Sequence, residues 1–226
     1  MPAGRQEIGR FRVAMWAEDP SCPVDRSTAA ALATVEHALA TAGAKVRSTA
    51  GPVGFSDSLR LFEQLLLATA TATTDDEAGA AELAAARDLR DDDASPRAAF
   101  LRHRTQTHRT WLRANEERLR LRETWQRFFA EAELDVIVTP AAPTPALLAG
   151  ARSLVVDGVE RSFFDQTGWL NLTSHIGLPS LVVPVTVSPE GLPIGVQIIG
   201  PMYSDRTLLT LAGALAPILE KAAAVA

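Results

Sequence analysis

The feature that most restricts the fold of this chain is a strand–helix–strand pattern near its N-terminus. Residues 11–16 form a short run of mainly apolar side chains, which is typical of a buried strand. Asp25 can then cap a helix whose leucine and valine side chains recur at helical spacing up to Gly43. Residues 44–46 can begin a second strand. Two strands joined through a helix form a βαβ unit, which predicts a partly parallel sheet.

Three helical segments are predicted in the middle of the chain. The first is capped by Ser56 or Ser58, the second covers residues 77–90, and the third is a long helix over residues 98–132. The acidic run 91–93 is predicted to be a solvated connection, because three adjacent carboxylates cannot all face one metal ion. Three glutamates are interspersed among the many arginines of the long helix, and this mixed charge favours a solvated face over a surface for nucleic acid.

The second half of the chain returns to strand-like patterns. Residues 134–138 form an apolar strand that stops at Thr139 and Pro140, and a proline-rich loop follows. Residues 181–185 and 194–199 are two further strands with turn residues between them, so they are predicted to form an antiparallel hairpin. Together these patterns predict an α/β protein in which a partial mixed β-sheet is flanked by helices.

Composition narrows the class of protein. The 226 residues are 47% apolar and 22% charged, which is typical of a globular chain, and no run reaches the ~18 apolar residues of a membrane span. The net charge of −5 argues against a nucleic-acid partner. The polar N-terminus and the single cysteine, Cys22, favour a cytoplasmic protein. We therefore expect neither nucleic acid nor membrane as a partner.

The residues themselves form no recognisable motif of an active site. The Gly-x-Ser-x-Gly, Walker, dinucleotide-binding and His-Glu-x-x-His motifs are absent. His103 and His108 lie five residues apart, so they face different sides of a helix and do not share a metal. Cys22, and the neighbours Ser174 and His175, are interpreted as structural residues. The sequence thus predicts no catalytic residue, no metal site and no cofactor.

A series of motifs in the second half is more informative. They are residues 135–140 (DVIVTP), 143–146 (PTPA), 165–169 (DQTGW), 177–184 (GLPSLVVP) and 191–201 (GLPIGVQIIGP). In this order they resemble the amidase signature family, and residues 12–25 resemble the segment that follows the signature region of that family. The resemblance covers nearly the whole chain and is strongest from Asp135 to Leu211.

The resemblance implies a function, and it also implies that the catalytic residues of the family are missing from this chain. Members of the family cleave a carbon–nitrogen amide bond with a serine nucleophile, a second serine and a lysine, and they use no metal or organic cofactor. Those residues and the oxyanion loop lie in the N-terminal half of the family, upstream of the segment that Phe11 begins. No Gly-Gly-Ser-Ser-Gly-like loop is present here, and neither Lys45 nor Lys221 matches the catalytic lysine. Residues 1–226 are therefore interpreted as a single incomplete amidase domain, the C-terminal portion of the fold.

The resemblance also places three residues near a substrate pocket. Thr139, Asp165 and Trp169 are candidates for a wall of that pocket in the complete enzyme. Relatives that handle glutamine carry a carboxylate for the substrate amine near the position of Thr167. A threonine there favours a linear or aryl amide as the small-molecule substrate.

Three hypotheses for function remain open at this point. The leading one is the C-terminal portion of an amidase that is inactive alone, whether from a truncated gene, a split gene or a cut fragment. The second is a non-catalytic binding or scaffold protein. The third is a subunit that is completed by a separately encoded catalytic half. Loss of neighbouring strands would expose sheet edges, so the leading hypothesis also predicts self-association.

Overall fold

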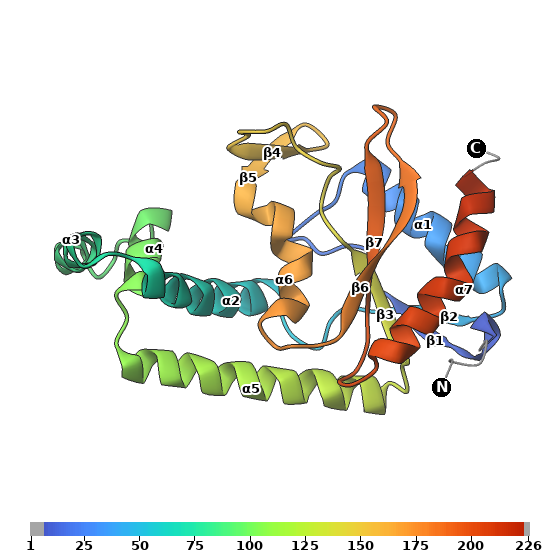
Figure 1. Cartoon of the computed structure of the whole chain (residues 1–226), viewed down its shortest axis with the longest axis horizontal. Coiled ribbons are helices and arrows are strands. Elements are labelled where there is room, and N and C mark those ends of the chain that lie inside the picture. The colour runs from blue at the N-terminus through green and yellow to red at the C-terminus, as the bar shows by residue number, and fades with distance from the viewer. Residues whose placement is uncertain (1–6, 224–226) are drawn as a thin grey trace.

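A mixed five-stranded sheet forms the centre of the computed structural model, which describes residues 7–223 (Figure 1). The strands lie in the order β2–β1–β3–β7–β6. They are β1 (Arg12–Met15), β2 (Lys45–Ser48), β3 (Val136–Pro140), β6 (Ser180–Val187) and β7 (Pro193–Ile199). β1 pairs in parallel with β2 and β3, whereas β7 is antiparallel to β3 and to β6. The predicted mixed sheet and the β6–β7 hairpin are confirmed.

The helix of the βαβ unit begins and ends as its sequence predicts. α1 (Arg26–Thr41) is capped by Asp25, whose side chain accepts a hydrogen bond of 2.7 Å from the backbone N–H of Thr28. Gly43 follows with φ of 89°, a left-handed conformation that suits glycine after a helix. α1 packs on one face of the sheet together with α7 (Asp205–Ala223).

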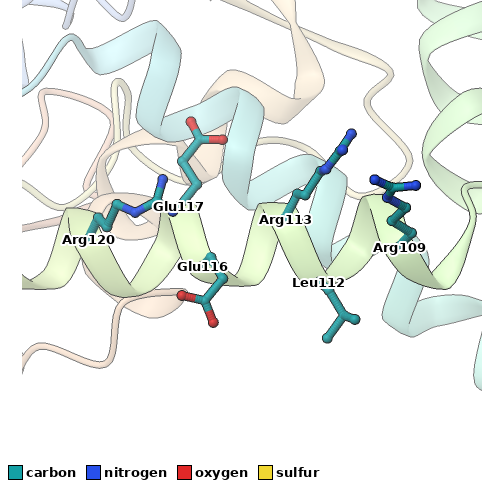
Figure 2. A pocket seen from close by; sticks show the side chains of 6 residues that line it. All are labelled: Arg109, Leu112, Arg113, Glu116, Glu117 and Arg120. Atoms are coloured by element: carbon teal, nitrogen blue, oxygen red, sulfur yellow. The ribbon is translucent and has the colours of Figure 1, made fainter.

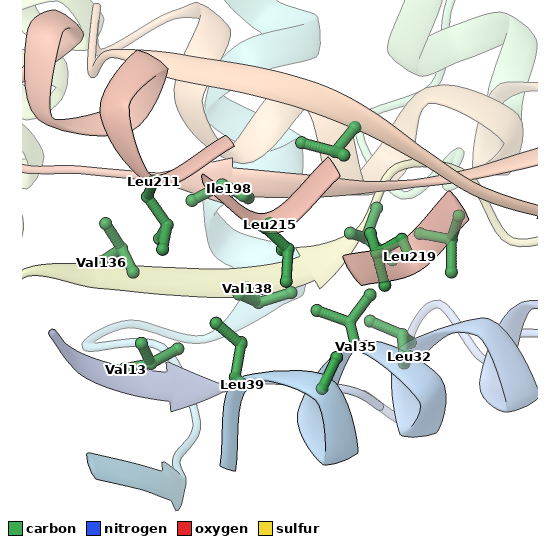
Figure 3. Packing of buried hydrophobic residues seen from close by; sticks show 14 of the residues in the cluster. Val13, Leu32, Val35, Leu39, Val136, Val138, Ile198, Leu211, Leu215 and Leu219 are labelled. Carbon is green, nitrogen blue, oxygen red and sulfur yellow. The ribbon is translucent and has the colours of Figure 1, made fainter. Parts of the chain in front are cut away.

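Aliphatic side chains fill the space between the sheet and these two helices. Figure 3 shows leucines of α1 and α7 meeting valines and isoleucines of β1, β3 and β7. Val13, Leu39, Val138, Ile198 and Leu211 are all fully buried. Burial of this many apolar side chains on one face fixes the strand register, because a slip of one residue would turn them toward solvent.

Aromatic side chains form a second core on the opposite face of the sheet. There α2 (Phe55–Ala70), α5 (His108–Glu131) and α6 (Gly168–Ser174) supply most of the residues that contact the strands. Trp16 lies among Phe55, Trp125 and Trp169, with ring centroids 6.1, 6.3 and 5.4 Å away. The sheet is therefore covered on both faces, as the predicted α/β class requires.

The helices between β2 and β3 form an arm that extends away from the sheet (Figure 1). It contains α2, α3 (Asp76–Arg87), α4 (Pro96–Arg104) and α5, with a short 3-10 turn (Thr71–Thr73) after α2. No residue of α3 is buried. Within residues 7–223, none of the helices is long and apolar enough to cross a membrane.

Two predictions about the arm are wrong. The single helix expected over residues 98–132 is broken between α4 and α5. Thr107 caps α5 by accepting a hydrogen bond from the N–H of Thr110, and Gln106 donates to the backbone carbonyl of Gln64. The expected serine cap of α2 is also absent, because the helix begins after Gly54 without a side-chain cap.

A second hairpin was not predicted from the sequence. β4 (Ser153–Val156) and β5 (Val159–Ser162) pair in antiparallel fashion, and a 3-10 turn (Phe163–Thr167) leads from them into α6. Asp157 and Gly158 both have positive φ, 46° and 87°, as a two-residue type I′ turn demands. A further 3-10 turn (Ile8–Arg10) precedes β1.

Candidate functional site

The carboxyl end of β3 brings two of the three predicted pocket residues together through a third side chain. Gln197 on β7 donates from Nε2 to Thr139 Oγ1 at 3.1 Å and to the backbone carbonyl of Trp169 at 3.2 Å. All three side chains are buried, and those of Thr139 and Trp169 have no exposed area. Gln197 Oε1 has no partner among the described residues, which is costly for a buried amide oxygen.

Trp169 joins α6 to the loop after β1. Its indole N–H donates to the backbone carbonyl of Cys22 at 3.0 Å. Its ring meets Phe55 edge-on at a centroid distance of 5.0 Å. In this structure Trp169 therefore contacts the aromatic core, and contact with substrate stays a prediction for both Trp169 and Thr139.

Asp165, the third predicted residue, lies in an ion pair. Arg161 donates from Nε to Asp165 Oδ2 at 2.7 Å and from Nη2 to the backbone carbonyl of Ser21 at 2.6 Å. The side chains of Arg161 and Asp165 keep only 25% and 17% of their area exposed. Burial, and secondarily the charge of Asp165, raise the pKa of the Glu63 carboxyl on α2. The carboxylate of Asp165 is already paired with a cation of the same chain, Arg161.

The proline-rich loop after β3 is fixed by polar contacts to its neighbours. The N–H of Asp25 donates to the carbonyl of Pro143 at 2.8 Å, and Thr144 Oγ1 donates to Gln166 Oε1 at 3.1 Å. A cavity of about 140 Å³ lies between this loop and the first turn of α1. It is smaller than the ~300 Å³ typical of ligand pockets, so it suits a few water molecules.

The residues interpreted as structural from the sequence have local partners. Ser174 donates to the carbonyl of Leu170, and His175 Nδ1 lies 2.8 Å from the carbonyl of Asn171. Both contacts are within the helical turn, so the two side chains do not form a serine–histidine dyad. Among the described residues, no group of three histidine, cysteine or acidic side chains is placed to hold a metal.

Cys22 is predicted to be unreactive in the folded protein. The side chain is only 2% exposed, and burial raises the pKa of its thiol to about 12. Because the thiolate is the reactive form, an aromatic disulfide reagent at about pH 8 should modify Cys22 only after unfolding in urea. Rapid modification of one thiol in the native protein would contradict this.

The same shift gives a pH dependence of stability. The unfolded thiol loses its proton near its ordinary pKa of 9.0, whereas the folded thiol keeps it to about 12. The folded state therefore binds more protons in this range, and Cys22 makes the free energy of unfolding fall as pH rises above about 9. Below pH 9 this contribution is fully present. Cys22→Ala should remove this part of the loss of stability at alkaline pH.

The fold is that of the amidase signature enzymes. A bacterial aryl acylamidase of that family superposes with a TM-score of 0.65 at 17% identity, covering 95% of this chain and 45% of that one. A fatty acid amide hydrolase gives 0.64 at 16% identity, covering 97% and 41%. The Amidase family model matches residues 2–209. This chain belongs to the amidase signature family.

Two sequence relatives match part of their own length. An indoleacetamide hydrolase from Allorhizobium ampelinum is 37% identical over 103 residues, which are 45% of this chain and 22% of that protein. One subunit of the glutamyl-tRNA(Gln) amidotransferase from Xanthobacter autotrophicus is 36% identical over 114 residues, 50% and 21% of the two chains. The matched segments thus cover about a fifth of each curated relative.

Proposed function

We propose that this chain is the C-terminal portion of an amidase signature hydrolase that cleaves the carbon–nitrogen bond of a linear or aryl amide, and that these 226 residues hydrolyse no amide unaided. One observation carries the proposal. The sequence follows the motif order of the family, but it holds no Gly/Ser-rich loop and only two lysines. In this proposal the chain supplies strands, covering helices and one wall of a pocket, and another segment supplies the catalytic groups.

The two lysines are poorly placed to serve as a base. Lys45 is exposed on β2 at the edge of the sheet, and Lys221 is exposed near the end of α7. A lysine accepts a proton at neutral pH only when burial or a neighbouring cation lowers its pKa. An oxyanion also needs backbone N–H groups aimed at it, each contributing ~3–4 kcal/mol to catalysis. The placement of both lysines within residues 7–223 thus supports the proposal that the catalytic groups come from another segment.

The proposed wall of the pocket consists of Thr139, Asp165 and Trp169. Thr167, the position at which glutamine-handling relatives bind the substrate amine, donates to the carbonyl of Phe164 and carries no charge. The nearby carboxylate of Asp165 is occupied by Arg161. A site without a free carboxylate favours an uncharged amide, and the indoleacetamide hydrolase among the relatives supports a linear amide that carries an aromatic ring.

A fluorophosphonate probe tests whether any serine in the chain is activated. The reagent phosphonylates a serine only when a base and oxyanion donors assist the attack. We expect the intact mass of the purified chain to stay unchanged under conditions that fully label a serine hydrolase added as control. A stoichiometric adduct that forms on the native chain but not on a chain denatured by heat before labelling would contradict the proposal.

A second candidate is a subunit completed by a separately encoded catalytic half. Exposed apolar side chains favour it, because eight of them are concentrated between residues 148 and 192. They are Leu148, Val155, Val159, Phe163, Phe164, Val182, Val187 and Leu192. β6 is also an edge strand, so its outer backbone groups are open to another strand. The amidotransferase relative is, by its name, one component of a larger assembly.

Co-expression with the adjacent reading frame separates the two candidates. A partner that copurifies, protects β6 from hydrogen exchange and adds amide hydrolysis would establish the second candidate. If the frame encodes no Gly/Ser-rich loop and no lysine in a comparable place, that candidate fails.

A further inference from the structure

The arm formed by α2 to α5 has a separation of charge that the proposed function does not explain. Residues 75–93 contain eight acidic and two basic side chains, a net charge of −6. Residues 97–127 contain nine arginines and three glutamates, a net charge of +6. The whole chain carries −5, so these two adjacent segments are far more strongly charged than the average of the molecule.

The acidic segment forms the far end of the arm. It covers α3 and the connection to α4, and α3 packs mainly against α4 (Figure 1). Glu77, Asp88 and Asp91 are exposed, and in the part of the chain that the structure describes their carboxylates make no hydrogen bond or ion pair. Their charges are therefore available to a partner. We refer to residues 75–93 as the acidic tip.

Six of the nine arginines of the basic segment lie on α5, and the other three lie on α4. Arg109, Arg113 and Arg120 are exposed and line a shallow groove on this helix with Leu112, Glu116 and Glu117. Figure 2 shows Arg109 and Arg113 projecting from the same side of α5. Glu117 is paired with Arg60 of α2 at 3.2 Å, so Glu116 is the remaining acid among these residues. This surface, which we call the basic face, is positive overall.

Exposed apolar side chains accompany both surfaces. Leu83 on α3 is 49% exposed, and Leu112 on the basic face is 45% exposed. Phe100 on α4 and Leu66 on α2 are also exposed, at 42% and 50%. Apolar residues ringed by charge are typical of a protein–protein contact, in which the apolar groups supply affinity and the charges set orientation.

We propose that the arm binds the arm of a second copy of this chain, with the acidic tip of each copy on the basic face of the other. A two-fold arrangement forms this contact twice, because each copy carries both surfaces. A nucleic acid would neutralise the basic face, but the acidic tip beside it and the net charge of −5 would repel the phosphates. Charge complementarity thus favours a second copy.

Reciprocal charge reversal tests the pairing. The tip variant carries Glu77→Lys, Asp88→Lys and Asp91→Lys, and the face variant carries Arg109→Glu, Arg113→Glu and Arg120→Glu. The substituted side chains are exposed, so both variants should fold. Sedimentation velocity in about 50 mM and about 500 mM NaCl measures association, since salt screens exposed charges.

We expect the parent chain to dimerise in low salt. In high salt the dissociation constant of the dimer should be at least about tenfold higher. Each variant alone should lose this salt-sensitive dimer, and an equal mixture of the two should recover it. A control with Glu36→Lys, Glu160→Lys and Glu220→Lys makes the same change of charge as the tip variant, but outside the arm, and it should dimerise like the parent. The proposal is overturned if the parent is monomeric in low salt, if either variant associates as strongly as the parent, or if the mixture stays monomeric.

Discussion

Trp169→Ala should lower the free energy of unfolding by about 4 kcal/mol, the scale for truncating a buried aromatic side chain. The ring has no exposed area and lies between Trp16 and Phe55. Its removal leaves a cavity in the aromatic core, and it also leaves the carbonyl of Cys22 without the donor at 3.0 Å. Urea denaturation followed by far-ultraviolet circular dichroism measures the change.

Two further variants control this prediction. Phe164→Ala removes an aromatic ring that lies five residues earlier and is 70% exposed, so the loss should stay below about 0.5 kcal/mol. Trp169→Phe keeps most of the ring but removes the donor, and about 1–3 kcal/mol should be lost. If Trp169→Ala destabilises the protein no more than Phe164→Ala does, the aromatic core is not packed as described.

The parts of the fold that could be predicted are those in which local and global preferences agree. Asp25, the apolar stripe of α1 and Gly43 each indicate the same helix, and the strands on either side are apolar runs. The turn between β6 and β7 could be predicted in the same way, because turn residues lie between two apolar runs. The register of β6 shifts between Pro184 and Thr186, which is consistent with a proline inside a strand, since proline lacks the N–H of a regular ladder.

The parts of the fold that were not predicted depend on sequence signals that are weak or that compete with one another. The break between α4 and α5 comes from a threonine cap and from Gln106 reaching Gln64, a contact 42 residues distant in sequence. Helical periodicity continues on both sides of it, so the pattern alone predicts one helix. The β4–β5 hairpin did carry a signal, Asp157-Gly158, but its strands are only four residues long.

The candidate site illustrates a different limit. Motif order proposed Thr139 and Trp169 for one wall of a pocket, yet it did not indicate that both side chains are fully buried. Gln197 was overlooked as the link between them, although a glutamine inside the apolar run 194–199 is itself unusual. Whether these residues face a substrate depends on segments that pack against them, and a one-dimensional pattern carries no information on that packing.

We propose that the chain has the scaffold of an amidase signature enzyme without its catalytic groups. The scaffold is supported by the family match over residues 2–209 and by superposition on enzymes of which it covers less than half. The chemistry needs a nucleophile, a base and oxyanion donors in one place, and removing any of them lowers the rate by orders of magnitude.

Amide hydrolysis by the purified chain tests this claim most directly. Ammonia released from indoleacetamide and aniline released from acetanilide are measured against buffer and against the same preparation after heating. We expect equal values in all three samples for both amides. Turnover that is heat-labile, proportional to the concentration of the chain and retained through further purification would contradict it.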